Sequence, residues 1–176
     1  MAEFDLAALE GAIRDVPDFP SAGIDFKDIT PLLATPELFS AAVQALSDPF
    51  VDQGIDAVVG IEARGFIFAA PVAQRLGAGF IPMRKAGKLP SETLAASYDL
   101  EYGTATLEVH VDAFRPGSRV LIVDDVLATG GTAAAAAGLV GRAGGQVIGI
   151  AVLIELGALD GVSSLGEVPL TAILRY

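Results

Sequence analysis

The sequence predicts an α/β fold with a central, mostly parallel sheet flanked by helices. Two continuous apolar runs of strand length, residues 119–123 and 146–155, are typical of strands buried on both faces of a sheet. Segments with helical spacing lie between the predicted strands, and this alternation is typical of parallel sheets. The chain has 176 residues, of which 52% are hydrophobic, so it is long enough for one domain with a large core.

The elements are justified in order by spacing and by breakers. Prolines and a glycine between residues 16 and 33 predict a loop, whereas Thr35 and Pro36 are typical of an N-cap and a first helical turn. Apolar residues three or four apart predict helices, and strict alternation predicts a half-buried strand. The predicted elements are a helix over 5–13, a loop over 16–33, a helix after Pro36, a strand over 55–61, a helix over 65–76, and strands over 79–83, 104–112 and 119–123, followed by a helix over 132–142 and a strand over 146–155.

Composition excludes several classes of protein. The chain has no cysteine and one histidine, which excludes disulfides, thiolate metal sites and a histidine metal cluster. Eleven Lys and Arg against 22 Asp and Glu give a formal net charge of −11, which argues against nucleic-acid binding. No apolar run is long enough to cross a membrane, and the N-terminus lacks the basic region of a secretion signal. We therefore expect a soluble cytoplasmic protein with no nucleic-acid or membrane partner.

The segment VLIVDDVLATGGT, residues 120–132, places two adjacent acids where a central strand is expected to end. Ligands of α/β sheets bind beyond the carboxyl ends of the strands. Gly130 and Gly131 allow close approach of a ligand, and the N–H groups at a helix N-terminus attract a phosphate. Thr129 and Thr132 add hydroxyl donors. We therefore predict that 128–132 binds a monophosphate.

The acids give the turn a more specific meaning. It is neither a Walker A loop nor a GxGxxG dinucleotide loop. Helix capping accounts for one acid but not for two. If the phosphate is on the 5′ carbon of a ribose, Asp124 and Asp125 are placed to accept hydrogen bonds from its hydroxyls and to meet Mg²⁺ through water.

This segment resembles the phosphoribosyl-diphosphate (PRPP) signature of the type I phosphoribosyltransferases. Four further segments are similar, in order, to the adenine phosphoribosyltransferases of that family, and the similarity covers nearly the whole chain. They are DFPSAGIDFKDITPLL (18–33), GIEARGF (60–66), RKAGKLP (84–90) and SYDLEYG (97–103). The resemblance implies a single phosphoribosyltransferase domain over 1–176, with a hood over residues 1–34 that covers the base and a mobile catalytic loop over 88–103.

The implied reaction converts adenine and PRPP into AMP and diphosphate, with Mg²⁺ as cofactor. Positive charge is needed around the departing diphosphate. The resemblance assigns Arg64 and Arg84 to catalysis, and Arg64, Lys85 and Lys88 to PRPP binding together with Asp124, Asp125, Ala128, Thr129, Gly130, Gly131 and Thr132. Without the resemblance, the basic cluster at 84–88 has the composition of a solvated loop.

The resemblance also assigns the base site. Glu101 matches a glutamate expected to exchange a proton at N7 of adenine, and Tyr102 is expected to pack over the closed site. Asp25, Phe26 and Lys27 match the part of the hood that reads the base, with Phe26 as the stacking surface. His110 lies on the polar face of its predicted strand and is interpreted as a surface residue.

The chain departs from the family at one place. Where the family has Gly-Arg after the last buried strand, this sequence has Gly161-Val162, so any contact of that arginine is lost or replaced. The resemblance also implies a homodimer, in which Arg84 is placed to reach a neighbour's site. Two alternatives to adenine transfer stay open: a phosphoribosyltransferase for xanthine or hypoxanthine, and a non-catalytic PRPP sensor that controls transcription.

Overall fold

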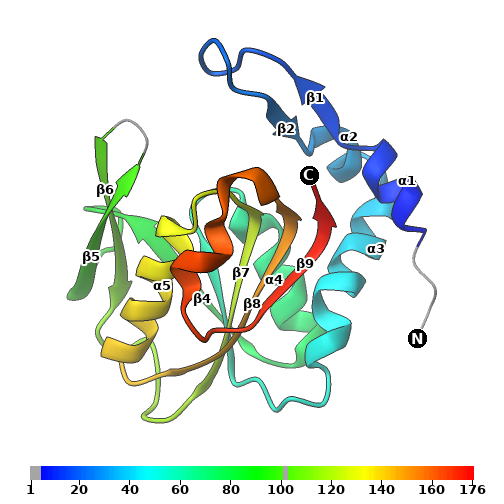
Figure 1. Ribbon diagram of the computed structural model, residues 1–176. Coiled ribbons are helices and arrows are strands. Elements are labelled where there is room, and N and C mark those ends of the chain that lie inside the picture. Colours follow the sequence, from blue (N-terminus) through cyan, green and yellow to red (C-terminus); the bar gives the residue numbers. More distant parts are fainter. Residues whose placement is uncertain (1–4, 101–102) are drawn as a thin grey trace.

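A seven-stranded sheet forms the centre of the molecule, in the order β5-β6-β4-β3-β7-β8-β9 (Figure 1). The computed structural model describes residues 5–100 and 103–176. Neighbouring strands from β4 to β9 are parallel, while β6 pairs antiparallel with both β4 and β5. The predicted α/β class with a mostly parallel sheet is confirmed. The parallel strands are β3 (Ala57–Ile61), β4 (Gly79–Lys85), β7 (Arg119–Leu127), β8 (Gln146–Glu155) and β9 (Leu170–Arg175).

Helices cover both faces of this sheet, as Figure 1 shows. Helices α3 (Pro36–Ser47) and α4 (Gly65–Leu76) pack on one face against Leu121 and Val123 of β7. Helix α5 (Gly131–Arg142) packs on the other face against Val120 and Ile122 of the same strand. Since successive side chains of a strand point to opposite faces, β7 supplies both cores and must be apolar throughout its first half.

The N-terminal region is more ordered than predicted. The loop predicted over 16–33 is wrong in part, because β2 (Phe26–Asp28) pairs antiparallel with β1 (Arg14–Val16). A short helix α2 (Thr30–Leu33) follows, and the Asp28 carboxylate accepts from the Thr30 N–H and hydroxyl at 2.9 and 2.8 Å. The β1–β2 hairpin projects beyond the sheet in Figure 1, whereas α1 (Leu6–Gly11) packs beside α3 with Leu9 fully buried.

Within the segment 88–103, which is predicted to be a mobile loop, the structure forms one strand of a β-hairpin. Strand β5 (Thr93–Leu100) pairs with β6 (Gly103–His110) along its whole length. Leu94, Ala96 and Tyr98 alternate along β5 and pack against the apolar cluster under α5. Arg142 at the end of α5 also donates to the carbonyl of Ala95 at 2.7 Å. Cross-strand pairing and this apolar face account for the strand, which the polar composition of the segment did not predict.

The predicted limits of the other helices and strands agree with the structure to different degrees. The helix over 65–76 and the strand over 146–155 are confirmed at both ends. Strand β7 continues to Leu127, so the two acids lie inside the strand and not after its end. Thr35 makes no side-chain cap and donates instead to the Pro31 carbonyl at 3.1 Å. Elements not predicted are η1 (Asp48–Phe50), η2 (Gly157–Leu159), η3 (Gly161–Leu165) and β9.

Candidate active site

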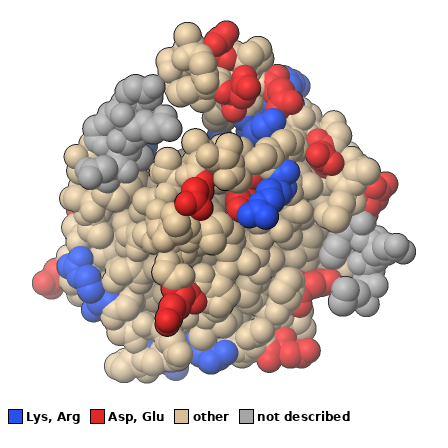
Figure 2. Space-filling view, in the orientation of Figure 1, with Lys and Arg blue, Asp and Glu red and all other residues tan. Residues whose placement is uncertain are grey.

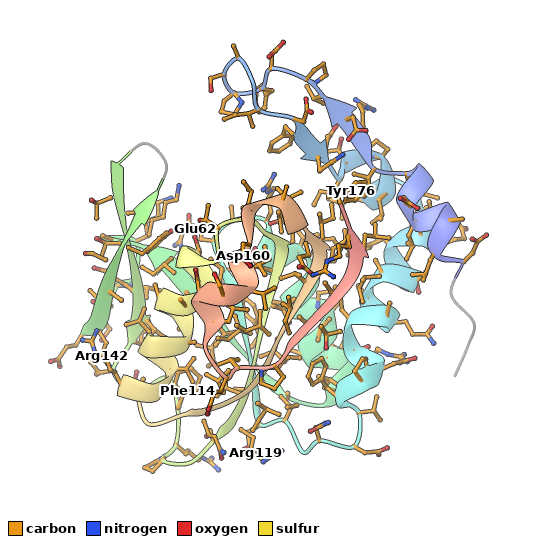
Figure 3. The ribbon with its side chains drawn as sticks, viewed as in Figure 1. Glu62, Phe114, Arg119, Arg142, Asp160 and Tyr176 are labelled. Carbon is orange, nitrogen blue, oxygen red and sulfur yellow. The ribbon has the colours of Figure 1, made fainter. Side chains whose placement is uncertain are left out.

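A cleft of about 1050 Å³ lies at the carboxyl ends of β3, β7 and β8. It is lined by the hood, the turn between β3 and α4, the end of β7 with the turn after it, Tyr98 of the hairpin, and the segment after β8. Figure 3 places Glu62, Asp160 and Tyr176 at the end of the sheet that faces the hood, and Phe114 and Arg119 at the opposite end. The cleft therefore occupies the position at which α/β sheets bind ligands.

The two acids line this cleft, with Asp125 buried and Asp124 half-buried. The Asp125 side chain is 5% exposed, and its backbone N–H donates to Asp124 Oδ1 at 2.9 Å. Burial, and secondly the charge of Asp125, raise the pKa of Asp124 well above its ordinary value. Burial also raises the pKa of Asp125, although the guanidinium of Arg64 opposes this change. The pair is thus electrostatically unfavourable until a cation or hydroxyl donors reach it.

Asp125 Oδ2 is a buried oxygen whose close partner is the charged side chain of Arg64. Arg64 Nε lies 2.8 Å from it, yet within the described residues this buried oxygen receives no aligned hydrogen bond. No group of three or more His, Asp or Glu side chains suited to a metal exists among those residues either. Such a site fits Mg²⁺ that is held mainly by substrate phosphates and water, with one or two carboxylates nearby.

The turn after β7 forms one wall of the cleft. Ala128, Thr129, Gly130 and Thr132 all line it. Gly130 precedes the first residue of α5, Gly131, and has a φ of 82°, which favours glycine. Main-chain N–H groups at the start of this 12-residue helix have no intrahelical acceptor, so the predicted phosphate residues are assembled at a suitable position.

The predicted basic cluster is organised by a carboxylate that sequence reasoning did not single out. Glu62 follows β3, lines the cleft and has a side chain only 8% exposed. Its two oxygens accept from Arg84 at 3.3 Å each and from Lys88 Nζ at 2.6 Å, and the Lys85 N–H donates at 3.0 Å. The Lys88 ammonium is the main reason that the pKa of Glu62 falls from 4.5 to about 2. Arg84 and Lys88 are therefore held beside the cleft by their bonds to Glu62, which lines it.

Arg64 connects the hood with the acid pair. Its guanidinium carbon lies 4.9 Å from the centroid of the Phe26 ring, in addition to its contact with Asp125. The structure thus brings Phe26, which the sequence analysis assigned to the base, together with Arg64 and Asp125, which it assigned to PRPP. A second edge of the Phe26 ring meets Phe19 at a centroid distance of 5.2 Å.

The remaining predicted residues differ in position. Asp25 lines the cleft and is exposed. Lys27 instead forms an ion pair with Asp15 and lies 4.1 Å from the centroid of the Tyr176 ring, so its side chain holds the hood to the C-terminal strand. Glu101 and Tyr102 lie outside the described residues.

Several cleft residues were not predicted. Tyr98, Leu156 and Leu159 supply apolar walls, and Leu159 is 42% exposed. A signal for Tyr98 existed in SYDLEYG, whereas the two leucines follow the last predicted strand and have no local pattern. The cleft therefore combines an anionic floor, a phosphate turn, a basic rim and apolar walls suited to a planar base.

Comparison with known proteins agrees with this geometry. A profile of the family described as "Phosphoribosyl transferase domain" matches residues 30–166. Adenine phosphoribosyltransferase of Thermobifida fusca is 65% identical over 161 residues, which are 92% of each chain. The chain belongs to the adenine phosphoribosyltransferase family. The activity of this family is phosphoribosyl transfer to adenine in purine salvage, as the resemblance implied.

Solved structures extend this agreement to the fold. The enzyme of Rhodothermus marinus shares 58% identity at a TM-score of 0.93, covering 97% of this chain and 98% of its own. The Saccharomyces cerevisiae enzyme, solved with an imino-altritol bisphosphate and adenine, shares 42% identity at a TM-score of 0.91, covering 96% and 98%. No helix in residues 5–100 and 103–176 has the length and hydropathy needed to cross a membrane.

Proposed function

We propose that the cleft binds PRPP and adenine side by side and that its residues divide the reaction as follows. The observation that carries this proposal is the joining of the acid pair, the phosphate turn and Arg64 in one cleft. The turn 128–132 binds the 5′-phosphate through main-chain N–H groups and the hydroxyls of Thr129 and Thr132. Asp124 and Asp125 accept hydrogen bonds from the ribose hydroxyls.

The leaving group requires cations. Diphosphate departs with the electron pair of its bond to C1 while N9 of adenine bonds to that carbon, so positive charge develops on the ribose and negative charge on the oxygens. Arg64 lies between the acid pair and the hood, and Arg84, Lys85 and Lys88 gather around Glu62 at the rim. We assign these four residues to the diphosphate.

Adenine is assigned to the space between the hood and the apolar walls. The S. cerevisiae relative was solved with adenine, which supports this base for the present chain. Asp25 and Lys27 contribute mainly through their backbone, and Phe26 provides a stacking surface once the Arg64 guanidinium turns toward diphosphate. Glu101 accepts the proton that adenine loses at N7 as N9 bonds to C1.

Mg²⁺ fits this site as a cofactor bound by PRPP, with Asp124 and Asp125 in reach of its water ligands. When bound, it neutralises phosphate charge. We further propose one domain whose hood (1–34) and loop (88–103) enclose the substrates, in a cytoplasmic homodimer. Sedimentation of the purified protein tests the dimer.

Steady-state assays with adenine, hypoxanthine, xanthine and guanine test the proposal. We expect turnover of adenine to AMP with release of one diphosphate, and turnover of the oxopurines at least about 100-fold lower, because their carbonyl would face groups arranged to accept from an amine. Faster turnover of an oxopurine would overturn the base assignment. PRPP binding without diphosphate release for any purine would identify the chain as a sensor.

A further inference from the structure

The segment after β8 packs its main chain directly against the phosphate turn. A methyl group added to Gly161 of η3 would lie 2.1 Å from the carbonyl oxygen of Ala128. One added to Gly130 would lie 2.2 Å from the carbonyl oxygen of Gly161. Both distances are far shorter than van der Waals contact. The two segments therefore meet backbone to backbone, and neither glycine has room for a side chain.

A side chain of the same helix adds a direct bond. Ser164 Oγ donates to the carbonyl oxygen of Thr129 at 2.9 Å. That carbonyl and the N–H of Gly130 belong to one rigid, planar peptide, so a bond that fixes the carbonyl also fixes the direction of the N–H. The neighbouring Ser163 makes a different bond, to the carbonyl of Asp160 at 2.8 Å within its own turn.

We propose that Ser164 is a positioning residue for PRPP, which holds the Thr129–Gly130 peptide in the orientation that binds the 5′-phosphate. The inference rests on the proposed role of 128–132. At the neighbouring position where the chain departs from the family, Val162 is apolar and 39% exposed, whereas Ser164 of the same turn bonds to the phosphate turn. Gly161 supports the same turn through the close contact of its backbone with Ala128.

The experiment compares matched variants by steady-state kinetics and by calorimetric binding of AMP and adenine. AMP carries the 5′-phosphate and adenine does not. Loss of one neutral hydrogen bond predicts that Ser164→Ala raises the KM for PRPP and the Kd for AMP by about 3- to 10-fold. The Kd for adenine stays unchanged and the melting temperature falls by only a few degrees. Ser164→Thr, which keeps the hydroxyl, restores both constants.

Two controls separate positioning from general damage. Ser163→Ala removes a hydroxyl from the same turn and is expected to leave the KM for PRPP unchanged. Gly161→Ala is expected to raise it by more than about 10-fold because the phosphate turn must move, whereas Gly138→Ala in α5, where a methyl group meets nothing within 4 Å, leaves it unchanged.

The outcomes distinguish this inference from the proposed function. Equal losses of AMP and adenine binding in Ser164→Ala, or equal effects of Ser163→Ala and Ser164→Ala, would overturn the positioning role. A normal KM for PRPP in both Ser164→Ala and Gly161→Ala would overturn it as well, while adenine turnover by the unmodified protein would still uphold the proposed function. Absence of that turnover would remove both.

Discussion

Replacing Glu62 by Gln tests whether this buried carboxylate organises the basic rim. The folded protein holds the pKa of Glu62 at about 2, against an ordinary value of 4.5, mainly through Lys88. A lowered pKa means that the ionised form stabilises the fold. This contribution is complete above about pH 4.5 and is lost as the pH falls toward 2.

The magnitude follows from the same contacts. The full difference in pKa corresponds to about 3 kcal/mol of unfolding free energy. This is an upper bound, since the side chains of Arg84 and Lys88 are 34% and 47% exposed and solvent screens their charges. We therefore expect Glu62→Gln to lower the free energy of unfolding by about 1–2 kcal/mol at pH 7.

Urea denaturation at pH 7, 5, 4 and 3 measures this loss for the variant and the unmodified protein. The difference between them is expected to be constant from pH 7 to 5 and to fall to less than half by pH 3. Glu108→Gln is a control on β6, because Glu108 also binds the basic loop but through the Gly87 N–H at 2.9 Å. A Glu62→Gln loss that is the same at pH 7 and pH 3 would refute the electrostatic reasoning.

Three further outcomes follow from the site and its supports. Replacing both Asp124 and Asp125 by Asn is expected to lower kcat/KM for PRPP at least about 100-fold, while urea denaturation shows a more stable protein at pH 7, an advantage that disappears toward pH 4 because the raised pKa values penalise only the ionised acids. Glu101→Gln is expected to lower kcat more than it changes the KM for PRPP, and the reverse pattern would remove its role in proton exchange. Gly60→Ala is expected to cost about 1–3 kcal/mol in urea denaturation, since its methyl group would lie 2.8 Å from side chains of α4 and β4, whereas Gly138→Ala is expected to cost nothing.

Local patterns predicted those elements whose limits are themselves local. Helix α4 ends at Gly77, which adopts a φ of 65°, and β8 is an apolar run with both faces buried. The end of β7 was predicted too early because charge was taken as a break in the strand. Its hydrogen bonds with β8 continue past the acids to Leu127, and pairing with a neighbour is not visible in the strand's own sequence.

The motifs likewise identified candidate site residues better than they identified the side chains that those residues contact. The resemblance supplied Arg84 and Lys88, but Glu62, which binds both, is separated from them by 22 and 26 residues. Only the parallel pairing of β3 with β4 brings these segments together, with Ile61 opposite Met83. Lys27 shows the same limit, since its motif assigned its backbone to the base and did not predict that its side chain lies against Tyr176. Few basic side chains appear on the face shown in Figure 2, so each such pairing has a large effect on local charge.

The acid pair shows most clearly that the site and the stability of the fold have different requirements. A strand that served only the core would continue apolar through Asp124 and Asp125, as β8 does opposite them. Burial instead raises the pKa of both acids, and the charge of Arg64, whose side chain is 42% exposed, offsets this increase only in part. Hydroxyl donors and a cation brought by the substrate would reverse this penalty, so the free energy withheld from folding becomes available for binding PRPP. If the acids bind the ribose as proposed, the same carboxylates that weaken the ligand-free protein make its affinity depend on the ribose hydroxyls and on the metal.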